Sequence, residues 1–437
     1  MTNLVFTKRR KFLASKIEDN SLVIIESAEE KIRNNDSTYR FRQNSNFYFL
    51  TGYALPNACL LLVKSKGRTS SYFFTKRPNK VDEIWTGKLE SQRVLQKRLE
   101  MDECHYSDEK ESLLFKHIKK SNVIYHSLDN NSVTKGLIES EIKNLEKKYR
   151  QGSQAPSKII SLNKIIHPMR LVKSIEEIKN IKKACAISVK AHKNLMQKCR
   201  PGIKEYELEA ELIYEFKKNN CYEAYTSIVA GGKNACILHY INNDSTLQNG
   251  DLLLTDAAAE YSNYASDITR TIPINGTFTK AQSQIYELVL KAQLNAINKC
   301  KVNNLWSDIH TEAVKTLSIG LIKLGFIKNT LSKVLKTESY KNFYMHNTGH
   351  WLGLDVHDPL DYADIKGSTR LKAGMIFTVE PGLYIKPDKS IPKQFHNIGI
   401  RIEDDILVTK KGPVVLTSKA PKTISDIERQ MKSYVKK

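Results

Sequence analysis

Short apolar runs alternate with polar, helix-forming stretches over the first third of the chain. The runs SLVIIES at 21–27, NACLLLV at 57–63 and SNVIYHS at 121–127 have the length and the β-branched residues of buried strands. Strands that alternate with helices predict an α/β domain of modest size. The stretch QGSQAPSKIISLNKIIHPMR at 151–170 is loop-like in composition, so we place a domain boundary between residues 168 and 169.

The second part of the chain opens on a strong helix signal. Ser174 followed by Glu177 fits a capping box, in which the two side chains satisfy free N–H groups at the helix start. Apolar residues then recur with a period near 3.6 over 178–199, and a second helix is predicted over 204–220. His192 lies on the apolar stripe of the first helix and is therefore predicted to pack in the core.

Strands dominate after Gly250, in two blocks. In the first block, GDLLLTDAAAEYSNYASDITRTIPI, two apolar runs flank the polar centre 261–264, which predicts a β-hairpin. Helices are predicted between the blocks, over 282–298 and 306–324. The second block contains GMIFTVEPGLYI and NIGIRIEDDILVT.

Four carboxylates interrupt these apolar strands. Asp256 ends the run LLLTD, and Asp267 begins the returning run DITRTIPI. Glu380 lies within IFTVEPGLYI, and Glu403 lies two residues after Arg401, on the same face of a strand. An ionised carboxylate among Ile, Leu and Val is costly unless it is paired or bound to metal. Four such residues, together with nearby histidines, indicate one collective site.

Three histidines fall in the segment MHNTGHWLGLDVHDP, at His346, His350 and His357, and His239 in CILHYINND is a fourth candidate. The glycines between them favour loop and strand over helix and allow the backbone to approach a metal or substrate closely. One imidazole among oxygen ligands suits manganese or the borderline ions iron, cobalt and zinc. Two divalent ions would balance four carboxylates, and coordination would lower the pKa of a bound water to about 7.

Charge and cysteine content limit which cellular location and which partners we expect for the protein. The 437 residues carry a formal net charge of +22, but the lysines are spread along the whole chain and form no nucleic-acid-binding module. Seven cysteines without a C-x-x-C pair indicate unpaired thiols in a reducing compartment and disfavour a thiolate zinc site. No apolar run has the length of a membrane helix or of a signal peptide. We expect a cytoplasmic protein without a membrane or a specific nucleic-acid partner.

Several motifs in a fixed order carry a family resemblance. RFRQNSNFYFLTGY and DEIWTG lie in the N-terminal part. CILHY, DLLLTD…EY…Y…DITRT, HWLGLDVHD, TVEPGLYI and GIRIEDD follow in the C-terminal part. With these motifs the chain closely resembles aminopeptidase P, also called Xaa-Pro aminopeptidase, of the pita-bread metallopeptidases. The resemblance implies an α+β protein: a creatinase-like α/β domain over 1–168, then a pita-bread catalytic domain over 169–437.

The same resemblance implies roles for particular residues. The implied metal ligands are Asp256, Asp267, His350, Glu380 and Glu403. Asp267 and Glu403 are expected to bridge two ions, with Asp256 on one ion and His350 and Glu380 on the other. Glu380 is also expected to take a proton from the attacking water.

Further catalytic residues are expected to surround the ligands. His239, His346 and His357 match histidines that hold substrate, stabilise the tetrahedral intermediate or assist the leaving nitrogen. Tyr225 and Arg401 match two further polar residues that line the site.

The implied activity is release of the N-terminal residue from peptides with proline at position two, by attack of a metal-bridging hydroxide. Two divalent ions are expected, Mn²⁺ first and Co²⁺, Fe²⁺ or Zn²⁺ as alternatives, in a homo-oligomer that is a dimer or a tetramer. Prolidase shares the fold and the ligands but takes only dipeptides, and it stays an alternative. A catalytically silent pita-bread protein that binds peptide, histone or RNA is a more remote one.

One motif departs from the family pattern. Asp256-Ala257-Ala258 stands where the family usually has Asp-x-Gly. A methyl group at position 258 is harmless unless the backbone there needs a positive φ, in which case it would crowd the chain.

Other conspicuous residues have simpler interpretations. Trp85 is either a core tryptophan or a residue that reaches a neighbouring subunit's cleft. Asp404 and Asp405 are expected on the surface or just behind the carboxylate cluster. The histidines expected to be ordinary surface or packing residues are His105, His117, His126, His167, His310 and His396.

Overall fold

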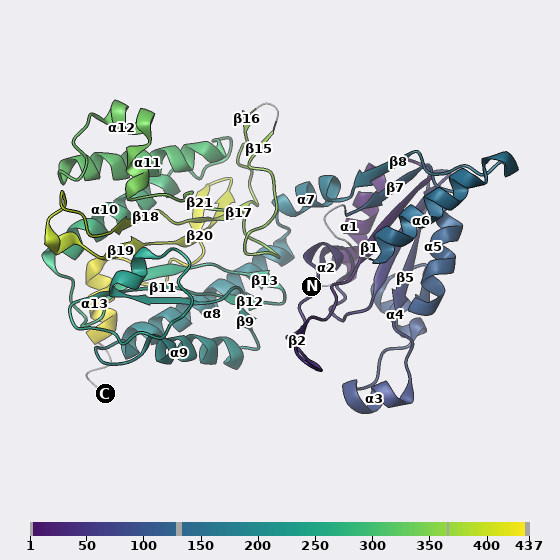
Figure 1. The fold of residues 1–437 in the computed structure, drawn as a ribbon, viewed down its shortest axis with the longest axis horizontal. Coiled ribbons are helices and arrows are strands. Elements are labelled where there is room, and N and C mark those ends of the chain that lie inside the picture. The colour runs from purple at the N-terminus through teal and green to yellow at the C-terminus, as the bar shows by residue number, and fades with distance from the viewer. Residues whose placement is uncertain (1–2, 128–132, 365–366, 433–437) are drawn as a thin grey trace. The chain divides into compact units, whose positions relative to one another are not determined.

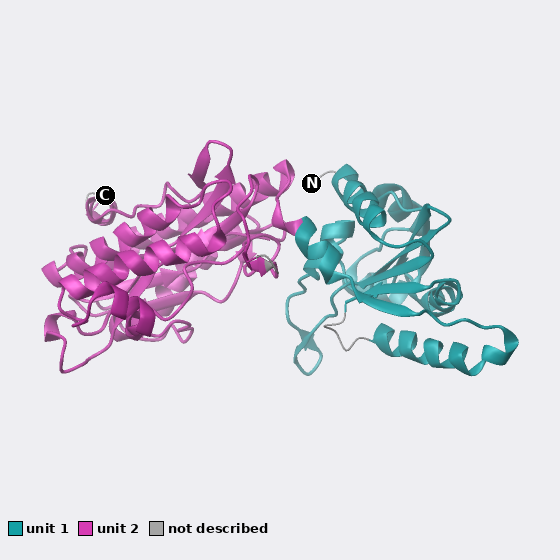
Figure 2. Cartoon of the chain, turned by 90° about the horizontal axis from the view of Figure 1, so that it is seen from above, with its two compact units in different colours: residues 1–169 teal, residues 170–437 magenta. Residues whose placement is uncertain are grey.

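The computed structural model describes residues 3–127, 133–364 and 367–432. By its internal contacts the chain divides into two compact units, residues 1–169 and residues 170–437 (Figure 2). We call them unit 1 and unit 2.

Unit 1 is built on a six-stranded sheet with the order β6-β5-β4-β1-β7-β8 (Figure 1). The central strand β1 (Ser21–Glu26) pairs antiparallel with β4 (Cys59–Ser65) and parallel with β7 (Val123–His126). These three strands are the apolar runs predicted from the sequence. The outer strands are β5 (Arg68–Thr75), β6 (Glu103–Tyr106) and β8 (Lys158–Ser161).

Helices cover both faces of this sheet. Leu114 and Ile118 of α5 (Lys110–Ile118) and Ile138 of α6 (Val133–Lys147) join the apolar side chains of one face. Phe47 of α2 (Ser45–Thr51) stacks on Phe73 on the other. The remaining helices of unit 1 are α1 (Asn3–Lys16), α3 (Lys80–Thr86) and α4 (Gln92–Leu99), and a small hairpin is formed by β2 (Ile32–Asn34) and β3 (Ser37–Thr38).

The loop predicted over 151–170 is wrong in its second half. Residues 158–161 form β8, which pairs with β7, and α7 (Asn163–Leu171) follows with Pro168 inside it. Ile166 of this helix is fully buried. Its burial outweighs the one hydrogen bond that the proline cannot donate.

Unit 2 contains several short antiparallel sheets rather than one large sheet. β11 (Leu252–Asp256) pairs with β14 (Thr269–Pro273), and β17 (Ile376–Val379) pairs with β20 (Asp404–Thr409). β18 (Gly382–Ile385) pairs with β19 (Ile398–Arg401). The shorter strands are β9 (Tyr222–Glu223), β10 (Ile228–Gly231), β12 (Ala259–Tyr261), β13 (Tyr264–Ala265), β15 (Ala363–Asp364), β16 (Gly367–Ser368) and β21 (Gly412–Val415).

The helices predicted for unit 2 are confirmed. α8 (Ile175–Lys198) begins with the capping box of Ser174 and Glu177, and α9 (Glu205–Lys218) follows it. His192 of α8 is fully buried, with Nε2 2.8 Å from the carbonyl oxygen of Ala257, so its interpretation as a core residue is also confirmed. The other helices are α10 (Lys280–Ile297), α11 (Trp306–Lys323), α12 (Leu331–Thr337) and α13 (Ile424–Lys432).

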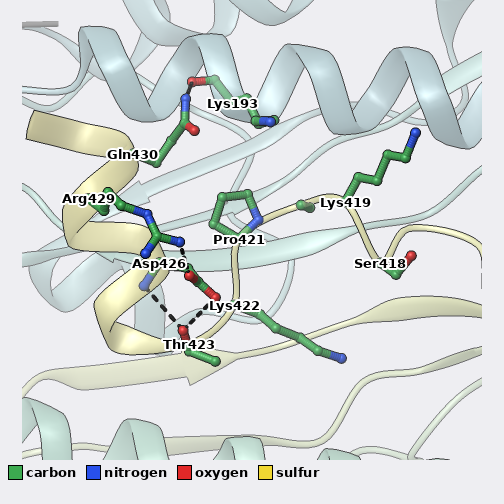
Figure 3. Close-up of a pocket in the computed structure, with 10 residues that line it drawn as sticks. Lys193, Ser418, Lys419, Pro421, Lys422, Thr423, Asp426, Arg429 and Gln430 are labelled. Atoms are coloured by element: carbon green, nitrogen blue, oxygen red, sulfur yellow. Dashed lines mark hydrogen bonds and ion pairs between the residues drawn. The ribbon is translucent and has the colours of Figure 1, made fainter. Parts of the chain in front are cut away.

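The segment of residues 418–430, which includes most of α13, packs against α8. A crevice of about 470 Å³ lies between them (Figure 3). Beside it, Gln430 Nε2 donates to the carbonyl oxygen of Lys193, at 3.4 Å. Lys422 extends away from Asp426 and Thr423, and its Nζ lies 2.7 Å from Asp404 Oδ2. The segment is thus fastened at one end to α8 and at the other to β20.

The predicted hairpin is confirmed, and its turn is tight. Ser262 and Asn263 connect β12 to β13 with φ values of 50° and 63°, as a two-residue turn of type I′ requires. All seven cysteines are free thiols. Within the described ranges, no helix combines the length and the apolar character that crossing a membrane requires.

Ala258, the departure from the family pattern, fits its position. Its methyl group is fully buried beside Val189, Ile268 and Ala420, and its backbone is outside the left-handed region. The alanine therefore strains nothing, and we expect Ala258→Gly to lower the free energy of unfolding by about 1–2 kcal/mol, from a lost methyl burial and a more flexible unfolded chain. Urea denaturation of the two proteins measures this difference. A glycine variant more stable than the natural chain would contradict it.

Candidate metal centre

The predicted ligands lie at strand ends of unit 2. Asp256 is the last residue of β11. Asp267 lies two residues before β14, the strand that pairs with β11. Glu380 directly follows β17, and Glu403 directly precedes β20, the strand paired with β17. Strand ends from different sheets therefore bring four carboxylates to one place.

The five predicted ligands form one connected cluster. Atoms of Asp267, His350 and Glu403 lie within 4.8 Å of one another, as a bound metal ion requires. His350 Nε2 is 3.3 Å from Asp267 Oδ2 and 3.6 Å from Glu380 Oε1. Asp256 joins through the Tyr225 hydroxyl, which lies 2.7 Å from Asp256 Oδ1 and 2.5 Å from Asp267 Oδ1.

The raised pKa values of these carboxylates indicate that the cluster needs a bound cation. Burial and the neighbouring carboxylates raise the pKa of Glu403 well above its ordinary value. Burial also raises the pKa of Glu380, to about 7, and that of Asp256. These carboxylates do not all ionise near neutral pH without added positive charge. Four carboxylates and one imidazole suit divalent ions such as Mn²⁺, so the residues present fit a metal centre.

Arg401 holds one side of the cluster. Its Nη2 donates to Asp256 Oδ2 at 2.6 Å, and its Nη1 donates to the Tyr384 hydroxyl at 3.0 Å. Tyr384 in turn lies 2.9 Å from His346 Nε2. His346 Nδ1 lies 2.8 Å from the carbonyl oxygen of its neighbour Asn347. Both ring nitrogens of His346 are therefore engaged.

Asp404 and Asp405 are buried just behind Asp267 and Glu403, so of the two positions expected for them the surface position is wrong. Asp405 Oδ2 accepts the backbone N–H of Asp267 at 3.0 Å. Asp404 Oδ1 accepts from Arg270 at 2.8 Å, and Arg270 also donates to the carbonyl oxygen of Glu403 at 2.6 Å. Both aspartates are fully buried because they fix the backbone that carries Asp267 and Glu403.

A cavity of about 960 Å³ opens over the cluster. His239, His346 and His357 line it, as do Tyr225 and Arg401, so the structure gathers every predicted site residue at this place. The rings of His350 and His357 lie 4.2 Å apart at an angle of 70°. The cavity volume lies near the upper end of the roughly 300–1,000 Å³ typical of ligand sites.

Sequence reasoning missed His310, which was expected to be an ordinary surface or packing residue. It lines the cavity from α11, and its Nδ1 lies 2.8 Å from the Thr348 hydroxyl. The backbone carbonyl of Thr348 accepts the N–H of Glu380 at 2.8 Å. No motif of the sequence marks His310, because its place at the cavity depends on the packing of α11 against the segment that holds Thr348. Tyr384 was missed because its place depends on the pairing of β18 with β19.

Trp85 lies outside the core. Its side chain is 82% exposed on α3 of unit 1, where no residue of the helix is buried. The interpretation as a core tryptophan is therefore wrong.

Comparison with known proteins identifies the family. The family model of metallopeptidase family M24 matches residues 179–410, the part of the chain that contains the whole cluster. The chain belongs to the M24 metallopeptidase family. The model of the aminopeptidase P N-terminal domain matches residues 6–125, within unit 1. This M24 peptidase therefore has the predicted order of an aminopeptidase P N-terminal domain and a catalytic domain.

Relatives and solved structures match this M24 peptidase along its length. The Xaa-Pro aminopeptidase of Escherichia coli K12 is 39% identical over 428 residues, which cover 98% of this chain and 97% of that protein. Human Xaa-Pro aminopeptidase 3 is 30% identical over 420 residues, which cover 93% of this chain and 80% of that protein.

Solved structures also superpose on this peptidase over its full length. The Pseudomonas aeruginosa aminopeptidase PepP superposes with a TM-score of 0.97 at 38% identity, covering 100% of this chain and 99% of that one. Aminopeptidase P of E. coli, solved with the inhibitor Pro-Leu, gives a TM-score of 0.96 at 38% identity and covers both chains fully. The protein is a metallopeptidase with the fold of these enzymes.

We expect bound metal to change the pH dependence of stability. In metal-free protein the pKa of Glu380 is raised from 4.5 to about 7. Burial lowers the pKa of His350, but Asp267 and Glu380 raise it more, from 6.5 to about 9. Both groups bind a proton more tightly in the folded state, so their contribution to metal-free stability should fall as pH rises from about 6 to 8.

Bound ions favour the deprotonated ligands, so their stabilisation should grow over the same interval, to about 2.7 kcal/mol at an ion concentration 100-fold above Kd. Scanning calorimetry of stripped and Mn²⁺-loaded protein measures both trends. The same pH dependence in stripped and in Mn²⁺-loaded protein would contradict the assignment.

Proposed function

We propose that this M24 peptidase is a dinuclear Xaa-Pro aminopeptidase, which releases the residue before a proline at position two. The observation that carries the proposal is the cluster of four carboxylates, two buried and two partly buried, and His350 under a cavity large enough for a peptide. The full-length similarity to Xaa-Pro aminopeptidases, N-terminal domain included, supports it.

Five residues would hold the two ions. Asp267 and Glu403 would bridge them, Asp256 would bind one ion, and His350 and Glu380 the other. The contacts of His350 with Asp267 and Glu380, and the link of Tyr225 to Asp256 and Asp267, support this division. The carboxylate-rich ligand set favours Mn²⁺ over Co²⁺, Fe²⁺ or Zn²⁺.

When bound, two divalent ions would polarise the scissile carbonyl and supply a bridging hydroxide as the attacking group. The chain's own residues would manage the protons. Glu380, whose Oε1 lies 3.6 Å from His350 Nε2 within the cluster, would accept a proton from the attacking water. The proline nitrogen is a tertiary amide and must gain a proton as it leaves.

The histidines divide into two kinds. Burial and Arg401 lower the pKa of His346 to about 3, and the bond from Tyr384 to Nε2 leaves Nδ1 as the donor to Asn347. His346 is thus a neutral side chain that lines the site in one fixed orientation. His357 and His239 line the cavity and would contact the substrate, stabilising the tetrahedral oxygen or assisting the leaving nitrogen.

The cavity favours aminopeptidase over prolidase activity. A dipeptide site needs little room beyond the metal centre, whereas about 960 Å³ accommodates a longer peptide. We also propose the domain division at residues 168 and 169. The cytoplasmic location and the assembly into a dimer or tetramer stay predictions.

The decisive experiment is hydrolysis of Arg-Pro-Pro and Arg-Pro by metal-stripped protein with and without added Mn²⁺. We expect metal-dependent release of arginine from the tripeptide at a higher kcat/KM than from the dipeptide. Strong preference for Arg-Pro would establish prolidase activity instead. Cleavage of neither peptide with any divalent ion would favour the binding-only alternative.

We expect Asp267→Asn to remove a bridging ligand and lower kcat at least about 10²-fold, with less bound metal per chain. Asp251→Asn is the matched control, because Asp251 immediately precedes β11 on the side away from the cluster. Steady-state kinetics together with metal analysis by mass spectrometry measure both variants. Full metal content and near-normal turnover in Asp267→Asn would refute the ligand assignment.

A further inference from the structure

A tight turn joins the ligand His350 to His357. The N–H of Asp358 bonds the carbonyl oxygen of Trp351 at 3.0 Å, and the N–H of Gly353 bonds that of Asp355, also at 3.0 Å. These bonds fold residues 351–358 back on themselves. The result is the near-perpendicular contact of the His350 and His357 rings, 4.2 Å apart.

The side chain of Asp358 closes this turn from inside. Its Oδ1 accepts the backbone N–H of Asp355 at 3.1 Å. A Cβ at Gly353 would overlap the Asp358 carboxylate and approach Lys173, so the carboxylate occupies the space that a side chain at 353 would need.

Two buried cations hold Asp358 in turn. Arg170 Nη2 lies 2.5 Å from Asp358 Oδ1, and Lys173 Nζ lies 3.0 Å from Oδ2. The side chains of the three residues are only 1–2% exposed. Arg170 also lies 2.6 Å from Asp355 Oδ2, within the turn. We call Arg170, Lys173, Asp355 and Asp358 the turn cluster.

The turn cluster is anchored at both sides. The backbone N–H of Lys173 bonds the carbonyl oxygen of Gly374, just before β17. The carbonyl oxygen of Gly353 accepts the N–H of Ala265, two residues before Asp267. The cluster thus connects the start of unit 2 to the segments that lead into two predicted ligands, although its four residues are not among those that line the cavity.

Stability alone explains this arrangement poorly. A buried ion pair gains little over apolar residues of the same volume, because desolvation offsets the attraction of the charges. What the ion pairs do specifically is fix the backbone, because the bonds to Asp358 and Asp355 hold the turn in one geometry. The residue that this geometry orients toward the cavity is His357.

We propose that Arg170 and Lys173, acting through Asp358, are positioning residues that fix the His357 imidazole over His350 for the reaction. The inference rests on the proposed peptidase function. It predicts that Asp358→Asn, which preserves size but removes the charge, lowers kcat on Arg-Pro-Pro about 10–100-fold at unchanged metal content, as is usual for partners that orient a metal site.

Glu215→Gln is the matched control. Glu215 is a buried carboxylate of the same unit that pairs with Lys190 at 2.8 Å, and it does not contact the turn. Loss of the same size in Glu215→Gln would show that any buried charge matters equally and would overturn the proposal. If Asp358→Asn does not fold, Arg170→Lys replaces it, because a lysine keeps the charge but cannot bridge both aspartates.

A double-mutant cycle with His357→Ala distinguishes positioning from general destabilisation. If the turn cluster acts through His357, Asp358→Asn should lower kcat little further once His357 is absent. Additive losses in the double variant would overturn the proposal.

A structural readout separates this inference from the proposed function. In protein with ¹³C-labelled histidines, the ring signal of His357 is identified by its absence in His357→Gln. Asp358→Asn should shift or broaden that signal while the signal of the core residue His192 stays in place. An unchanged His357 signal would overturn the inference even if the protein is an active peptidase. A wild-type protein that cuts no Xaa-Pro peptide would refute the function and leave this readout as the test of positioning.

Discussion

The mutual repulsion of four carboxylates, two buried and two partly buried, is the constraint around which unit 2 is organised. Asp256, Asp267, Glu380 and Glu403 lie at the ends of strands from different sheets, and burial raises the pKa values of three of them. Among the residues described, Arg401 is the permanent cation in direct contact with the cluster, through Asp256. The charge of one guanidinium does not balance the charge of four carboxylates, so this site requires divalent ions.

The charges around the cluster are treated in the opposite way. Asp404 lies against Arg270 and Lys422, and Asp358 lies against Arg170 and Lys173, each at 3.0 Å or less. These carboxylates are fully compensated by protein groups, which fixes them and the backbone that they hold. The predicted metal ligands are less compensated: Arg401 pairs with Asp256, and the pKa values of Glu380 and Glu403 stay raised. Pairing with a cation of the chain thus separates Asp404 and Asp358 from most of the predicted ligand set.

The predicted ligands, which the structure gathers at one cavity, stood out in the sequence because their chemistry conflicts with their surroundings: a carboxylate inside a run such as LLLTD needs an explanation. The strands β1, β4 and β7 and the helices α8–α11 followed from period and capping. What the sequence left open depends on long-range contacts. Of the two positions expected for Asp404 and Asp405, the one behind the cluster is found, and it requires Arg270 and Thr417 from distant segments. The segment 158–171 looked like loop because its partners, β7 and the core of unit 1, lie far away in the chain.

The histidines show why a motif specifies a site less completely than a structure does. In the sequence His346, His350 and His357 stand in one segment and look equivalent. In the fold, His346 has both nitrogens engaged by Tyr384 and Asn347, and His350 lies between Asp267 and Glu380. His357 stands over His350, at the end of a turn closed by buried charges. Contacts that the motif alone does not reveal therefore distinguish the three imidazoles: one is held at both nitrogens, one lies among the carboxylates, and one lines the cavity at the end of the turn.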